Sequence, residues 1–207
     1  MPAAMPLPDE FRELFGWMEA NGLFTPSDAY PGDMLGLLGT NDDLQSDRVT
    51  AIFFRVATPE QAHGNGHDWF GDVVPNIEDR LVLFARTGGD GSHAAFWLDD
   101  QGGRQIVHLG SEGLVCLLGH TPLDFLRLMA IGYEEISGDC AGMPHKPPRE
   151  GGRNAAYRAW LTGRYGVTIP ETATEILDEI PEPFAETSND PFWRWVKKHQ
   201  DERDRDA

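Results

Sequence analysis

Residues 63–72 (HGNGHDWFGD) hold a close set of side chains that could bind a metal ion. His63, His67 and Asp68 supply nitrogen and oxygen ligands of the kind that zinc prefers. Histidines four residues apart meet on one face of a helix, but the glycines between them disfavour a helix here. A plain polar loop is therefore the favoured interpretation. A metal-dependent enzyme that uses His63, His67 and Asp68 is the alternative.

A second candidate is the glycine-rich stretch at residues 86–103 (RTGGDGSHAAFWLDDQGG). A phosphate-binding loop leads from a strand into a helix N-terminus, whereas this one leads into the strand-like HAAFWL, with no lysine at the required spacing. A calcium loop needs acids at every second residue, which Asp90, Asp99 and Asp100 do not provide. The stretch is therefore predicted to form turns, with Asp90-Gly91 delivering the chain into the next strand.

No pattern in the sequence supports nucleophilic catalysis. Ser92 and Ser111 both lack the Gly-x-Ser-x-Gly spacing between a strand and a helix. Cys116 lies in the apolar run LVCLLG, where we expect a buried, unreactive thiol. The sequence predicts no catalytic residue and no cofactor, so the protein is expected not to be an enzyme.

The charge of the chain narrows the choice of partner. It holds 34 acidic and 17 basic side chains, a formal net charge of −17. Nucleic acids and anionic membranes attract clustered lysine and arginine, so neither is expected to bind directly. A basic protein partner is favoured, because complementary fields speed the encounter of two proteins. The sequence shows neither a membrane-length apolar run nor a signal peptide. It has only two cysteines, Cys116 and Cys140, and nothing suggests a disulfide scaffold, so the cytoplasm is the expected location.

The candidate residues for binding that partner are acids and one aromatic residue in predicted loops. One loop includes residues 41–47, and the other covers residues 58–79. The candidates are Asp42, Asp43, Asp47, Asp68, Trp69, Asp72, Glu78 and Asp79.

The elements that must position these residues are predicted to form an α+β core. Helical spacing of apolar residues predicts a helix over residues 8–22, and β-branched and aromatic residues predict a strand over residues 48–57. Four apolar runs between glycine-rich breaks predict an antiparallel meander. The runs cover residues 80–87, 93–99, 104–110 and 114–119. A further helix is predicted after Thr121, with Pro122 at its first position.

The C-terminal third is predicted to be a helical extension packed on the core. Helices are expected over residues 153–166, from a capping box at Thr172, and from Asp190-Pro191, with the last residues fraying. Trp193 and Trp195 point in different directions on the last helix, so at least one should dock on the core. The expected organisation is a domain at 1–136, a linker at 137–152 and the extension at 153–207. The fold class is α+β, with a single antiparallel-rich sheet of about five or six strands packed against helices.

Three stretches in this order resemble the SUKH superfamily, the Smi/Knr-type domain. Residues 7–22 (LPDEFRELFGWMEANG) are similar to its opening helix. Residues 88–113 (GGDGSHAAFWLDDQGGRQIVHLGSEG) are similar to its central strand–turn–strand region. Residues 121–133 (TPLDFLRLMAIGY) are similar to its closing helix. The resemblance covers roughly residues 7–136.

The resemblance implies a single sheet packed against helices and no catalytic residues. Many bacterial members of the superfamily are immunity proteins that neutralise toxins, often nucleases, and others are regulators or scaffolds. The expected function is therefore a non-enzymatic protein-binding domain, an immunity protein or a regulatory adaptor, that acts through an acidic surface. The oligomeric state is left open, and self-association through the C-terminal helices is a third possibility.

Overall fold

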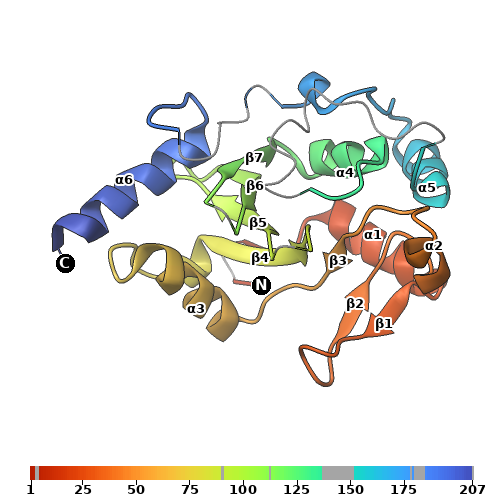
Figure 1. Cartoon of the computed structure of the whole chain (residues 1–207), viewed down its shortest axis with the longest axis horizontal. Helices are drawn as coiled ribbons and strands as arrows, with labels where there is room; N and C mark the ends of the chain where they lie inside the picture. Colours follow the sequence, from red (N-terminus) through yellow and green to blue (C-terminus); the bar gives the residue numbers. More distant parts are fainter. Residues whose placement is uncertain are drawn as a thin grey trace.

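The computed structural model describes residues 1, 2, 5–89, 91–111, 113–136, 152–177, 179 and 185–206. These residues form one seven-stranded antiparallel sheet, in which each strand pairs with the next along the chain (Figure 1). The strands are β1 (Phe24–Pro26), β2 (Met34–Gly36), β3 (Phe53–Phe54), β4 (Leu81–Arg86), β5 (His93–Leu98), β6 (Arg104–Leu109) and β7 (Val115–Gly119). The expected α+β class is confirmed, with slightly more strands than the five or six expected.

The predicted meander corresponds to β4–β7, and each strand lies within a residue or two of its predicted bounds. The strand predicted over residues 48–57 is much shorter, because only β3 pairs regularly with its neighbours. The backbone N–H groups of Arg55 and Ala57 still donate to the carbonyl oxygens of Phe84 and Leu83, each at 2.8 Å. The chain thus follows β4 beyond β3, but a register shift between Leu83 and Ala85 interrupts the ladder.

Helices cover both faces of the sheet (Figure 1). The helices are α1 (Asp9–Ala20), α2 (Asn41–Gln45), α3 (Pro59–Phe70), α4 (Pro122–Ile131), α5 (Ala155–Tyr165) and α6 (Pro191–Asp206), with 3₁₀ turns η1 (Ile77–Asp79) and η4 (Ala173–Glu175). Helices α1 and α4 pack on one face, and α3 and α6 pack on the other. The expected start of α4 is confirmed, because Thr121 and Asp124 form a reciprocal capping box before Pro122.

The core between α1, α4 and the sheet is built around Phe11, which is fully buried. Its ring lies 4.8 Å from Phe84 and 4.9 Å from Phe96, both in edge-to-face arrangements. Phe125 of α4 packs edge-to-face against Phe84 at 5.4 Å. Such aromatic pairs add to the free energy gained from burial alone. They hold α1 and α4 on this face of the sheet.

The core on the opposite face depends on α6. Trp195 is buried, and its ring lies 5.0 Å from Phe70 of α3 and 5.7 Å from Trp97 of β5. The burial of Trp195 confirms that at least one of the two tryptophans docks on the core, and Trp193 is partly buried against the same core. Asp190 anchors the start of α6: its carboxylate accepts 2.8 Å hydrogen bonds from the backbone N–H groups of Leu117 and Trp193. The C-terminal helix therefore completes the second face of the sheet.

The rest of the C-terminal third agrees only partly with expectation. The linker at 137–152 lies outside the described residues, apart from Gly152. Helix α5 matches its prediction. After Thr172 the structure has only the turn η4 where a longer helix was expected, although Glu175 does accept a hydrogen bond from the backbone N–H of Thr172. The predicted fraying after residue 200 is wrong, because α6 continues to Asp206.

The loop predicted over residues 58–79 is also wrong, because most of it forms α3 and η1. A capping box between Thr58 and Gln61 begins α3, with Pro59 at its first position. Gly66 is buried where the helix crosses η1, and a Cβ atom at this position would collide with the Ile77 side chain. The glycine that disfavoured a helix by propensity is thus required by the packing of that helix.

Replacing each of the two α3 glycines by alanine should have opposite effects on the free energy of unfolding. Gly64→Ala should raise the free energy of unfolding by about 1 kcal/mol, because alanine has the higher helix propensity and the site is open. Gly66→Ala should lower it by about 1–3 kcal/mol, because the new methyl group overpacks the contact with Ile77. Urea unfolding followed by circular dichroism measures both. Equal effects of the two substitutions would contradict the close approach of α3 and η1.

An ion pair joins α1 to α5 and makes stability depend on pH. Arg164 donates to the Glu13 carboxylate at 2.5 and 2.7 Å, and the Tyr165 hydroxyl donates to it at 2.6 Å. The Arg164 bond, followed by the Tyr165 bond, lowers the pKa of Glu13 from 4.5 to about 2. The unfolded state therefore binds more protons than the folded state between these values, and stability falls as the pH drops through this window.

Glu13→Gln should reduce this acid sensitivity. The substitution removes the shifted carboxyl group, so the urea midpoint should fall less steeply between pH 4.5 and 2 than it does in the wild type. Asp43, whose pKa is also lowered to about 2, maintains part of the slope in the variant. Urea midpoints measured across this pH range test the expectation, and parallel slopes for the two proteins would refute it.

Candidate functional site

The eight predicted partner-binding residues lie in two separate regions of the fold. Asp42, Asp43 and Asp47 lie in or directly after α2, whereas the others lie on α3, on η1 and between them. The two regions lie at opposite ends of the molecule (Figure 1). They do not form one continuous surface.

In the α2 region, two of the three carboxylates already serve the fold. Asp43 caps α2 through Thr40 and accepts a 2.8 Å bond from Arg48, and these hydrogen bonds lower its pKa to about 2. Asp47 accepts hydrogen bonds of 2.6–2.9 Å from the buried guanidinium of Arg153. Asp42 alone of the three is exposed. This region is therefore mainly structural.

The α3 region presents four of its five acids fully to solvent, whereas Glu78 is partly buried and contacts His63. We call it the α3–η1 acidic surface, which consists of Glu60, Asp68, Asp72, Glu78 and Asp79. Within the described residues, no lysine or arginine forms an ion pair with these five side chains. Trp69 is partly buried, and its carbonyl oxygen accepts a 3.0 Å bond from Arg203 of α6. Helix α6 thus fixes the C-terminal end of α3 and, with it, the position of these carboxylates.

His63 and His67 lie one turn apart on α3, contrary to the loop that was expected. Nδ1 of His63 lies 3.0 Å from Oε2 of Glu78, and Nε2 of His67 lies 3.8 Å from Oδ1 of Asp72. Each histidine therefore faces its own carboxylate. Across the described part of the chain, no three histidine, cysteine or acidic side chains are arranged to hold a metal ion. The set His63, His67 and Asp68 has no such arrangement.

The glycine-rich stretch forms turns, as predicted. The Asp99 carboxylate accepts bonds from the backbone N–H groups of Gln101 at 2.9 Å and Gly103 at 2.7 Å. Gly91 has φ +100°, and Asp90 lies outside the described residues.

Cys116 is buried, and desolvation followed by the charge of Asp190 raises the pKa of its thiol well above the ordinary value. A thiol in that state is a poor nucleophile.

A pocket of about 520 Å³ opens beside α3, and sequence reasoning did not identify it. It lies on the α3 side of the sheet, next to the area that α6 covers. Its walls come from the β1–β2 turn, from α3 and from the turn after β4. The apolar part of its floor includes Leu35, Phe53, Leu83 and Ala85. Its volume lies within the range of small-molecule sites.

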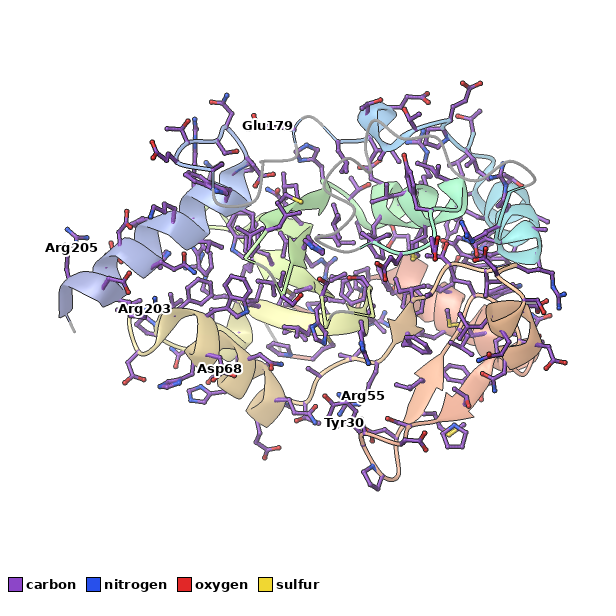
Figure 2. All side chains as sticks on the ribbon, in the orientation of Figure 1. Tyr30, Arg55, Asp68, Glu179, Arg203 and Arg205 are labelled. Carbon is purple, nitrogen blue, oxygen red and sulfur yellow. The ribbon has the colours of Figure 1, made fainter. Side chains whose placement is uncertain are left out.

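Arg55 is held rigidly in this pocket. It donates to Asp33 at 2.6 Å and to Gln61 of α3 at 2.8 Å, and its guanidinium lies 3.7 Å from the centre of the Tyr30 ring. Figure 2 shows Tyr30 and Arg55 together below the sheet, with Asp68 towards α3. The Arg55 side chain is only 14% exposed. The β1–β2 turn is thereby tied to α3 across the pocket.

Arg86 is the second arginine of the pocket. Phe53 and Arg86 are paired across β3 and β4, and Arg55 follows Phe53 by two residues, so these three side chains leave the same face of the sheet. Arg86 donates to the carbonyl oxygens of Gly88 at 3.1 Å and Gly89 at 2.8 Å. No local pattern in the sequence links Arg55 with Arg86, because the two residues lie in separate segments that pair only in the fold.

Comparison with known protein families, with curated proteins and with solved structures gave no match. Among the described residues, no helix combines the length and apolar character needed to cross a bilayer. The function is therefore inferred from the fold, from the α3–η1 acidic surface and from the pocket beside α3.

Proposed function

We propose that this chain is a non-enzymatic protein-binding domain of the SUKH type. It acts as a cytoplasmic immunity or regulatory protein that binds a basic partner through the α3–η1 acidic surface. The observation that carries this proposal is the exposure of Asp68, Asp72 and Asp79 without an arginine or lysine partner in the described chain. Asp68 and Asp79 can attract a cationic surface without giving up an ion pair to a described residue, and Asp72 faces only His67, at 3.8 Å.

The rest of the molecule supports this choice of surface. A net charge of −17 provides a long-range field that steers a basic protein towards the chain. A toxin that binds nucleic acid has the basic surface that fits this field. The order of opening helix, meander and closing helix agrees with the SUKH resemblance. Asp43 and Asp47 have a smaller role in the proposal, because binding would compete with their own ion pairs.

A pull-down with the tagged protein tests this surface. The wild type is compared in lysate of its own organism with Asp72→Lys/Asp79→Lys, at low and at high salt. The control, Glu19→Lys/Glu171→Lys, makes the same charge change at exposed acids on α1 and after α5, away from α3 and η1. We expect a basic partner that wild type and control retain at low salt, that high salt removes, and that the Asp72/Asp79 variant loses. Equal retention by both variants would refute the α3–η1 acidic surface as the binding site.

A further inference from the structure

The pocket beside α3 is less acidic than the protein around it. Among the described residues, Arg55, Arg86 and Asp68 line it, and Asp33 pairs with Arg55 at 2.6 Å. These four side chains sum to a formal charge of zero with His93 neutral, in a chain of −17. Arg86 forms no ion pair with a described residue, so the pocket offers one guanidinium group to an anion beside an apolar floor.

The two guanidinium groups are prepared to bind an acceptor. In Arg55 and in Arg86, the Nε and one Nη group donate to the protein, as described above. For the second Nη group of each, the described residues provide no acceptor. Fixing an arginine before binding lowers the entropy lost when a ligand is bound. A charge-assisted hydrogen bond from such a group is about twice as strong as a neutral one.

We propose that this pocket binds a small organic anion with a flat apolar body. The anionic group would accept from Arg86 and Arg55, and the ring would lie on Leu35, Phe53 and Leu83. Asp68 and Asn65 on the α3 wall would accept a hydrogen bond from the far side of the ring. A large anionic molecule is disfavoured because the whole chain repels it, whereas a small monovalent anion meets mainly the Arg86 guanidinium group. Asp68 belongs both to the pocket wall and to the α3–η1 acidic surface, so the two sites adjoin. Their tests stay separate, because Asp72 and Asp79 do not line the pocket, and Arg86 and Gly64 are not part of the acidic surface.

Fluorescence titration with 8-anilinonaphthalene-1-sulfonate tests the pocket, since this probe combines an aromatic body with one anionic group. We expect the folded wild type to bind one molecule of probe. Indole-3-acetate should displace it, and the uncharged indole-3-acetamide should displace it at least tenfold more weakly. Near-ultraviolet circular dichroism establishes that each protein tested is folded.

Two variants locate the bound probe. Arg86→Gln removes the guanidinium group that pairs with no described carboxylate, and should weaken probe binding by about tenfold. Gly64→Leu places a side chain on the α3 wall and should block the pocket without changing its charge. The matched controls are Arg48→Gln, an exposed arginine near α2, and Gly163→Leu, an open position on α5. Both controls should bind the probe like the wild type.

Three results would overturn the proposal. The first is a folded wild-type protein that does not bind the probe. The second is equal binding by the two pocket variants and their controls. The third is equal displacement by indole-3-acetate and its amide, because a purely apolar site would not distinguish them.

Discussion

Trp195→Ala is expected to lower the free energy of unfolding by about 3–5 kcal/mol, as is typical for a large buried aromatic residue. The Trp195 side chain contacts Phe70, Trp97 and Phe192, so its removal leaves a cavity between α6 and the sheet. The second core would lose one of the contacts that join α3 to α6. Urea unfolding followed by circular dichroism measures the loss.

Two further substitutions identify the origin of this loss. Trp193→Ala on the same helix should cost less than half as much, because Trp193 is only partly buried. Trp195→Phe should also retain most of the stability, because the indole N–H of Trp195 has no hydrogen-bond acceptor among the described residues. Equal losses for the two tryptophan-to-alanine variants would contradict the docking of α6 through Trp195.

Asn154→Ala is expected to cost a similar amount, about 3–5 kcal/mol, because it leaves several buried polar groups unsatisfied. The fully buried Asn154 amide donates to Thr50 Oγ1 and to the Met129 carbonyl oxygen, each at 2.8 Å. Its Oδ1 accepts from the backbone N–H of Thr50, also at 2.8 Å. These bonds tie the start of α5 to the chain before β3 and to α4. Thermal and urea unfolding measure the loss.

Asn154→Gly separates the side chain from the backbone. Asn154 has φ +64°, a conformation that glycine adopts without strain and alanine does not. If the hydrogen bonds dominate, Asn154→Gly should recover only about 1 kcal/mol of the loss. Full recovery of wild-type stability by glycine would show that backbone strain in the alanine variant, and not the lost hydrogen bonds, caused the effect.

The features that could be predicted from the sequence depend on residues close together in the chain. The capping box of Thr121 and Asp124 and the turns around Gly91 and Asp99 satisfy backbone groups only a few residues away. The meander follows for the same reason, because its strands pair with their neighbours in sequence. The burial of Cys116 was predictable because its whole segment is apolar.

Helix α3 shows where local reasoning gave the wrong answer. Gly64 and Gly66 lower the helix propensity of residues 59–70, and that cost is real for an isolated segment. In the fold, the close contact of Gly66 with Ile77 and the burial of Phe70 against Trp195 stabilise the helix. Packing of this kind outweighs a cost of about 1 kcal/mol per glycine. The sequence contains both contact partners but not their proximity.

The sequence by itself determined the α+β class, the meander, the main helix starts and the acidic charge of this protein. Only the tertiary structure decided which acids are free: Asp47 meets Arg153 across more than half the chain, whereas Asp68 forms no ion pair with any described residue. It also decided that Arg55 and Arg86 share one pocket. Turns and caps are fixed by hydrogen bonds within a few residues. Ion pairs and pockets form between segments whose proximity arises only when the cores on both faces of the sheet are packed.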